Sequence, residues 1–158
     1  MSTTIYHGSN TEVRKPKILT SGYTKDFGFG FYCTCIENQA IRWALTRRNK
    51  HIVNTYLYEP DSTLKILSFD RMTDEWLDFI ADCRHGKKHS FDIVEGPMAD
   101  DEIWDYVEDF LDGKIDRDAF WELAKFKHPT HQIVFCTQKA LETVTFVNSK
   151  EYEEQVLP

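Results

Sequence analysis

The chain has 158 residues, of which 41% are hydrophobic, 14% aromatic and 28% charged, and this composition predicts one globular domain spanning residues 1–158. It excludes a largely disordered chain, and no run approaches the roughly 18 consecutive apolar residues that a membrane helix needs. The net charge of −7 comes without the basic stripe that phosphate contacts require, which argues against a general nucleic-acid binder.

The N-terminal residues and the cysteines predict the compartment. Residues 1–7 have neither the basic nor the apolar region of a secretory signal, so we expect a cytoplasmic protein without a membrane anchor. The four cysteines form no CxxC pair and no closely spaced group with histidines, so we expect reduced thiols and no metal site.

The first half of the chain predicts two short strands, a helix and a longer strand. The β-rich runs cover Thr3–His7 and Phe29–Thr34, and a third run over Ile52–Glu59 ends at Pro60. Between them lies a stripe with helical spacing, formed by Ile36, Ala40, Trp43, Ala44 and Arg47.

The second half predicts more helices. A strand over Leu64–Phe69 precedes a helix over Asp74–Arg84, which Thr73 caps and Gly86 stops. Further strands are predicted over residues 91–94, 132–136 and 144–147, and further helices over about 103–111 and from residue 116. Strands before and after the helices predict an α+β fold with six or seven short strands and flanking helices.

Acidic residues are concentrated between Asp100 and Asp118. This segment holds nine acidic and two basic residues, so it accounts for the whole net charge of −7. A solvated helix face explains the concentration, and so does a docking surface for a basic partner.

The segment Tyr6–Ser9 ends the first predicted strand. Gly8 has no side chain, so a ligand can approach the backbone closely, and the backbone N–H and C=O there can both bond to a ligand amide. The neighbouring His7 imidazole can hydrogen-bond a ligand hydroxyl. A turn at Gly8 beside a structural histidine is the alternative.

The segment Asp26–Thr34 combines glycines with aromatic residues. Gly28 and Gly30 lead into the second strand, but neither the third glycine of a dinucleotide motif nor a phosphate-loop lysine follows. Tyr32 and Trp43 are eleven residues apart and can clamp a flat ligand if the helix returns the indole to the strand. Plain core packing of both rings is the alternative.

The late strand opens with a polar residue, Gln132, within His131–Thr137. In a strand, Gln132 and Val134 share one face. A polar amide in an otherwise apolar strand needs a partner, which is either a structural backbone group or a ligand.

Together these motifs resemble the ADP-ribosyltransferase superfamily, in its diphtheria-toxin and poly(ADP-ribose) polymerase branch with a His, Tyr, Glu signature. More narrowly, the chain is similar to uncharacterised bacterial domains that share YHGS, DFGxGFYxT, GPxADD and HQxxFxTxxAL motifs, over about Ile5–Phe146. The resemblance implies an ADP-ribosyltransferase-like split β-sheet core and NAD as co-substrate, with no metal.

The resemblance also implies a role for each matching residue. His7 binds a ribose hydroxyl of NAD, Gly8 holds the nicotinamide carboxamide through its backbone, and Ser9 adds a hydroxyl contact. Tyr32 and Trp43 sandwich the nicotinamide ring. The implied catalytic residues are His7, Tyr32 and Gln132.

Gln132 departs from the branch, which has glutamate at this place. A carboxylate bonds the nicotinamide-ribose 2′-hydroxyl and stabilises the developing positive charge, whereas an amide only orients, so about tenfold in rate is expected to be lost. Asp100 or Asp101 is expected to supply negative charge as an accessory residue, unless both simply begin an acidic helix. Arg42, Arg47 and Arg48 are expected to bind the pyrophosphate. Solvation of the helix end explains these arginines equally well.

The resemblance thus implies a bacterial mono-ADP-ribosyltransferase that releases nicotinamide and modifies a macromolecular acceptor, a protein rather than a nucleic acid. Such domains often act as toxins restrained by a small antitoxin-like partner. The alternatives are an NAD glycohydrolase, in which water replaces the acceptor, and a pseudoenzyme that binds NAD or a protein. An RNA 2′-phosphotransferase shares the fold, but the acidic balance of the chain argues against it.

Overall fold

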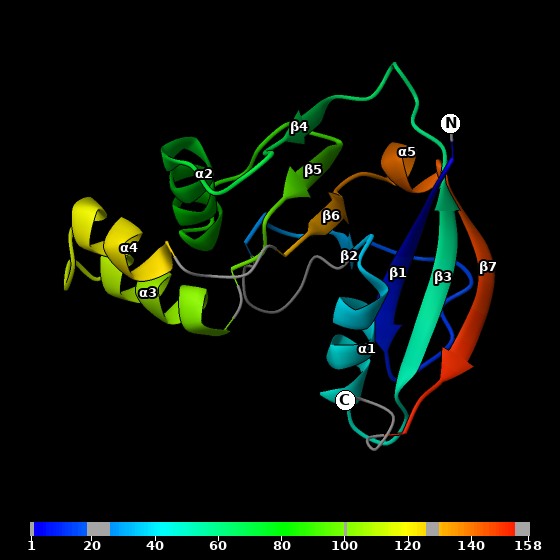
Figure 1. Ribbon diagram of the computed structural model, residues 1–158. Helices are drawn as coiled ribbons and strands as arrows, with labels where there is room; N and C mark the ends of the chain where they lie inside the picture. Colours follow the sequence, from blue (N-terminus) through cyan, green and yellow to red (C-terminus); the bar gives the residue numbers. More distant parts are fainter. Residues whose placement is uncertain (1, 19–25, 100, 126–129, 154–158) are drawn as a thin grey trace.

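The computed structural model describes residues 2–18, 26–99, 101–125 and 130–153. Within these residues, seven strands form a three-stranded and a four-stranded sheet, and five helices accompany them. The α+β class predicted from the sequence is confirmed at this level. A group of helices stands at the end of the molecule away from the three-stranded sheet (Figure 1).

The three-stranded sheet is antiparallel, in the order β1-β3-β7. Its strands are β1 (Thr3–Ser9), β3 (Ile52–Tyr58) and β7 (Val144–Glu151). Helix α1 (Glu37–Leu45) packs against β1 through its buried alanines. The helix begins with an acidic residue, as its dipole favours.

The four-stranded sheet has the order β2-β6-β5-β4. Its strands are β2 (Phe31–Cys33), β6 (Gln132–Phe135), β5 (Ile93–Gly96) and β4 (Ile66–Ser68). All pairs are antiparallel except β4 with β5. A backbone bridge between Tyr6 and Thr34 joins the two sheets, and no further β1–β2 pair follows it in the described residues, so β1 and β2 separate beyond it.

Of the remaining helices, three pack against one face of the four-stranded sheet, and the short fourth one packs into the core between the two sheets. They are α2 (Asp74–Arg84), α3 (Asp101–Leu111), α4 (Arg117–Ala124) and the short α5 (Gln138–Leu141). Thr73 and Asp116 cap α2 and α4 by accepting backbone N–H bonds three residues on. None of the described helices is long and apolar enough to cross a bilayer.

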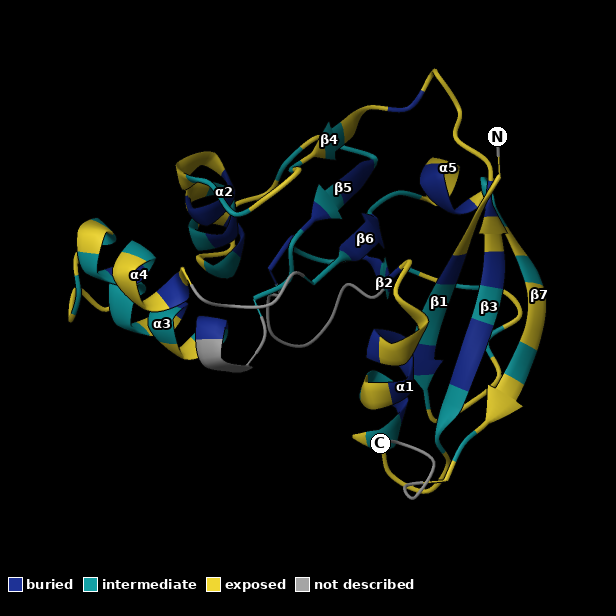
Figure 2. Ribbon diagram, in the orientation of Figure 1, coloured by how far each residue is buried: buried dark blue, intermediate teal, exposed yellow. Residues whose placement is uncertain are grey.

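Strand β6 divides the interior into two cores. Ile133 and Phe135 face the core between the two sheets, where Tyr56 is also buried. Val134 faces the opposite way, into the core that α2, α3 and α4 close with Trp76. Figure 2 shows buried residues on the inner strands of both sheets. Gln132 shares the Val134 face, because residues two apart in a strand point the same way.

Several element boundaries differ from those predicted. The strand expected over Phe29–Thr34 is reduced to Phe31–Cys33, because the chain turns at Gly28, whose φ is +83°. Both β1 and β7 are longer than expected, since β3 offers pairing partners along its whole length. The short α5 was not expected, although Thr137 caps it with the same geometry as Thr73.

Candidate functional site

A cleft of about 440 Å³ opens where β1 and β2 separate. We call it the His7 cleft, because His7, Gly8 and Ser9 of β1 line it together with Tyr32 of β2. Three basic side chains also line the cleft, namely Lys15, Lys17 and Arg47. The sequence motif at the end of the first strand and the aromatic segment therefore meet at one cavity.

The His7 ring is held by the second strand. Its Nδ1 lies 2.6 Å from the carbonyl oxygen of Tyr32, and its ring centroid lies 4.4 Å from that of Phe31. A carbonyl oxygen only accepts, so Nδ1 donates to it and Nε2 is the acceptor atom of the neutral ring. Ser9 lies next along the same wall, and its Oγ accepts from the Thr11 N–H at 3.3 Å.

Among the residues that the structure describes, none pairs with the Gly8 backbone on the side facing β2. Tyr6 exchanges bonds of 2.8 and 2.9 Å with Thr34, so its N–H and C=O point away from β3. Backbone groups of an antiparallel strand alternate in direction, so Gly8, two residues on, points its own N–H and C=O the same way. The bridge bonds end at Tyr6, and in the described part of the chain no group hydrogen-bonds to the N–H or the C=O of Gly8.

Gly8 is also the place where α1 crosses β1. A Cβ at this position would lie 2.4 Å from the Ala40 carbonyl oxygen and 2.7 Å from the Ala44 nitrogen. The helix backbone therefore requires glycine here, independently of any ligand. Buried polar backbone groups are usually paired, so an unpaired N–H and C=O at a cleft wall are suited to a ligand amide.

The Tyr32 side chain is fixed by its hydroxyl. The hydroxyl accepts from the Phe27 N–H at 3.1 Å and donates to the Gly28 carbonyl at 2.6 Å. Burial is the main cause that raises the pKa of Tyr32 well above its usual value, so the hydroxyl stays neutral. Its ring is thus held at the cleft in one orientation.

Trp43 lies near Gly8 but is not among the side chains that line the His7 cleft. Its Cβ would be 2.9 Å from a Cβ at Gly8, and the residue is half-buried on α1. The predicted aromatic clamp thus has one member, Tyr32, in the cleft wall. Trp43 lies on α1, where this helix packs against Gly8.

Gln132 is buried at the start of β6 and is likewise not among the lining residues of the cleft. It shares a sheet face with Tyr32, because Tyr32 pairs with Val134. Its Nε2 donates to Asp26 Oδ2 at 3.2 Å and, at 3.5 Å, to the Pro97 carbonyl. The structural partner that the sequence left open is therefore a carboxylate from the DFGxGFYxT segment.

The structure places only some of the predicted accessory acids and pyrophosphate ligands at the His7 cleft. Asp100 lies outside the described residues, and Asp101 begins α3 with a side chain that is not described. Of the three expected pyrophosphate ligands, Arg47 lines the cleft, whereas Arg42 and Arg48 are exposed and do not. Sequence reasoning missed Lys15 and Lys17, whose only signal is the basic run from residue 14 to 17.

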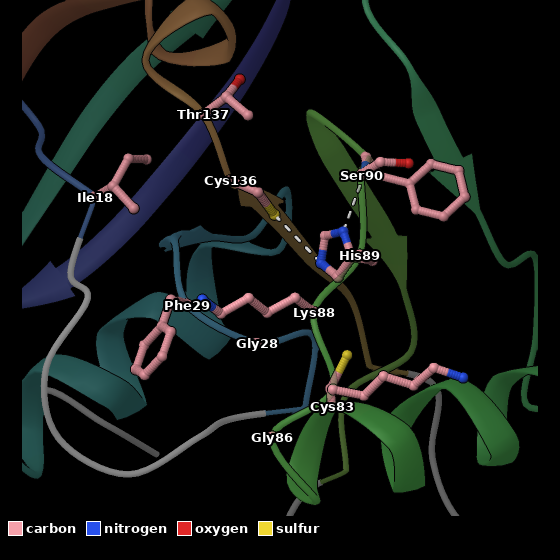
Figure 3. A pocket seen from close by; sticks show the side chains of 12 residues that line it. Ile18, Gly28, Phe29, Cys83, Gly86, Lys88, His89, Ser90, Cys136 and Thr137 are labelled. Carbon is pink, nitrogen blue, oxygen red and sulfur yellow. Dashed lines mark hydrogen bonds between the residues drawn. The ribbon is translucent and has the colours of Figure 1, made fainter.

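A second cavity, of about 380 Å³, lies beside the same glycine-rich segment (Figure 3). We call it the His89 cavity. His89 Nε2 lies 3.1 Å from the Phe27 carbonyl, and Nδ1 accepts from the Phe91 N–H at 3.1 Å. Cys136 Sγ lies 4.0 Å from Nε2, and burial raises the pKa of this thiol to about 12. Both histidine nitrogens are therefore engaged by the protein's own backbone.

Comparison with known proteins identifies a family. No curated protein and no solved structure matches the chain. The model of a family described as "Protein of unknown function (DUF3990)" matches residues 3–146, which include both walls of the His7 cleft and Gln132. The chain belongs to this DUF3990 family.

Proposed function

We propose that the chain is an NAD-dependent mono-ADP-ribosyltransferase, which releases nicotinamide and transfers ADP-ribose to a macromolecular acceptor. The observation that carries the proposal is the backbone N–H and C=O of Gly8 at the wall of the His7 cleft, which no other described residue pairs. A primary carboxamide has one acceptor oxygen and an NH₂ donor, so it complements this pair of groups.

The rest of the cleft supports the same ligand. Tyr32 lines the cleft, and an aromatic residue at its wall suits a pyridinium ring. The His7 Nε2, as an acceptor, suits a ribose hydroxyl. Lys15, Lys17 and Arg47 provide positive charge for a pyrophosphate in a protein whose net charge is −7. A splayed pair of β1 and β2 supports the split β-sheet core of the ADP-ribosyltransferase fold.

The reaction breaks the C1′–N bond of the nicotinamide ribose. The bonding electrons leave with nicotinamide, which becomes a neutral ring, and the ribose carries positive charge until an acceptor nucleophile adds and loses its proton. Gln132 Oε1 hydrogen-bonds the ribose 2′-hydroxyl in this scheme. A neutral acceptor contributes about 0.5–1.5 kcal/mol where a charged one contributes about 1.5–3 kcal/mol, so the rate is slow and not zero.

The test is free nicotinamide, measured by chromatography after the purified protein is incubated with NAD. Release above background that is lost in His7→Ala supports the proposal. Labelled NAD in a cell lysate then separates transferase from glycohydrolase, because only transfer leaves label on a macromolecule. An absence of release by the wild-type protein contradicts the enzymatic proposal.

One observation favours a second candidate, a binding domain without catalysis. Gln132 is buried and committed to Asp26, in a position where the enzymes that the chain resembles use a charged group. Such a domain binds NAD at the His7 cleft by calorimetry and releases no nicotinamide. A small partner that docks on the acidic residues 100–118 remains a prediction for either candidate.

A further inference from the structure

Asp26 is a buried carboxylate that collects four hydrogen-bond donors. Only 4% of the residue is exposed. Its Oδ1 accepts from Arg84 Nε at 3.1 Å and from Arg84 Nη2, and its Oδ2 accepts from the Ala99 N–H at 2.9 Å and from Gln132 Nε2. No role for this residue was predicted from the sequence, although it opens the DFGxGFYxT segment.

These donors come from three distant parts of the chain. Arg84 ends α2, and its guanidinium lies 3.3 Å from the centroid of the Trp104 ring on α3. Ala99 follows β5. The next residues along the segment, Phe27 and Gly28, hold the Tyr32 hydroxyl. One carboxylate thus connects the Tyr32 side of the His7 cleft to Gln132.

The contacts also fix which way the Gln132 amide faces. Both protons on Nε2 have acceptors, Asp26 Oδ2 and the Pro97 carbonyl. Among the residues that the structure describes, none donates to Oε1. A flipped amide would place Oε1 against the Asp26 carboxylate, where two acceptors repel, so Oε1 is the atom left for a ligand.

From this geometry we infer that Asp26 is a positioning residue: it orients the Gln132 amide so that Oε1, and not Nε2, is presented to the ribose 2′-hydroxyl. The inference rests on the proposed function for the identity of the ligand. The orientation itself rests only on the contacts of Asp26 and Gln132.

The pair also explains why glutamine stands at residue 132. A glutamate there would put a second carboxylate about 3.2 Å from Asp26 Oδ2, the present distance of Gln132 Nε2. Two carboxylates so close cannot both ionise. Gln132→Glu alone, which introduces the residue of the enzymes that the chain resembles, is therefore expected to lower activity. Glutamate becomes acceptable only when residue 26 is neutral.

The experiment measures nicotinamide release from NAD by wild type, Asp26→Asn, Gln132→Glu and the double variant. The asparagine introduced by Asp26→Asn has one side-chain oxygen, which accepts from the Arg84 guanidinium. The amide nitrogen of this asparagine then faces Gln132 and donates to Oε1, so Nε2 of Gln132 turns toward the ribose. We expect kcat to fall about tenfold in each single variant, with KM for NAD within about twofold, because one transition-state hydrogen bond is lost. The double variant restores kcat, since the introduced asparagine amide donates to the introduced glutamate.

The matched control is Asp92→Asn. Asp92 accepts from the Lys65 N–H at 2.9 Å and from the Thr137 hydroxyl at 2.8 Å. It therefore contacts the chain after the C-terminal end of β6, whereas Asp26 contacts Gln132 at the N-terminal end. Its loss is expected to leave kcat unchanged. The inference is overturned if Asp26→Asn keeps the wild-type kcat. It is also overturned if the fold-decrease in kcat of the double variant equals the product of the fold-decreases of the two single variants.

A second readout does not need catalysis. The chain has four glutamines, so their side-chain amides can be resolved by NMR in protein labelled with ¹⁵N-glutamine. We expect slow solvent exchange of the Gln132 amide protons, and a shift of their resonances in Asp26→Asn but not in Asp92→Asn. Fast exchange with no response to Asp26→Asn overturns the inference. If the wild type releases no nicotinamide while these signals behave as expected, the proposed function fails and the orientation by Asp26 stands.

Discussion

The His7 cleft and the His89 cavity are similar in size, about 440 and 380 Å³, and the same segment around Gly28–Tyr32 borders both. Each contains a histidine that contacts a backbone carbonyl of this segment. They differ in their polar groups. The second nitrogen of His89 accepts from the Phe91 N–H, whereas the Gly8 backbone in the wall of the His7 cleft has no partner within the described ranges.

This difference shows that volume alone does not mark a binding site. In the His89 cavity both ring nitrogens of His89 have backbone partners and the Thr137 hydroxyl donates to Asp92. The thiols of Cys83 and Cys136 are protonated because burial raises the pKa of each to about 12. No buried side-chain nitrogen or oxygen among the described residues that line this cavity lacks a partner. The Gly8 backbone at the His7 cleft has no described partner, because the bridge at Tyr6 stops where β1 and β2 diverge.

The largest effect is expected for Gly8→Ala, which tests whether the cleft wall is built as described. The added Cβ would lie 2.4 Å from the Ala40 carbonyl oxygen, so α1 must move, at a cost of about 3 kcal/mol or more in unfolding free energy. Gly86→Ala is the control, since it has a φ of +85° and no contact within 4 Å, and it is expected to cost about 1 kcal/mol. Equal midpoints in urea denaturation for the two variants would contradict the packing of α1 on Gly8.

A histidine exchange sharpens the comparison of the two cavities. His7→Ala is expected to weaken NAD binding about tenfold, because a hydrogen bond to the ribose is lost. His89→Ala is expected to leave NAD affinity unchanged and to lower stability by about 1–3 kcal/mol, because the Phe27 carbonyl and Phe91 N–H lose their partner. Calorimetry and urea denaturation on both variants measure these effects, and the opposite pattern would place the ligand in the His89 cavity.

A smaller effect is expected from acid at Asp92, next to Phe91 in the wall of the His89 cavity. The Lys65 N–H and the Thr137 hydroxyl lower the pKa of this carboxyl in the folded protein. Its stabilisation is therefore present above the unfolded pKa of about 3.9 and is lost as the pH falls through the lower folded value. Asp92→Asn should flatten the decline of stability below about pH 4 by at most about 1 kcal/mol, because the residue is only half-buried and solvent screens its interactions. An unchanged acid profile in the variant would show that Asp92 has no such role.

The smallest effect is expected from thiol modification. Cys35 is exposed, whereas the pKa of Cys136 is raised to about 12, so iodoacetamide at pH 8 should alkylate Cys35 first. Peptide mass spectrometry follows both sites over time. NAD binding should persist when Cys35 alone is modified. Rapid alkylation of Cys136 would show that the His89 cavity is a reactive thiol site.

The predictions from sequence succeeded where structure is local. The helix over Asp74–Arg84 was predicted with its bounds, because the Thr73 cap and the apolar spacing lie within the segment itself. The meeting of His7 and Tyr32 followed from motif order in a resembling family. It is now seen as a contact across 25 residues of chain.

What the sequence did not predict depends on long-range contacts. Asp26 meets Arg84 across 58 residues and Gln132 across 106, and no local period encodes such a network. The basic side chains Lys15 and Lys17 join the cleft only because the chain after β1 folds back over it. The clamp with Trp43 was predicted from its spacing to Tyr32 and from the family resemblance, and neither says which way an indole on a helix points.

The most direct test of the His7 cleft is an NMR titration of ¹⁵N-glycine-labelled protein with NAD and with nicotinamide. The chain has seven glycines, with Gly8 in the cleft and Gly28 and Gly86 at the His89 cavity. We predict that the Gly8 amide shifts most with both ligands, as its N–H gains the carboxamide oxygen, while Gly28 and Gly86 stay in place. Saturable shifts at Gly28 and Gly86 with an unmoved Gly8 would contradict the account.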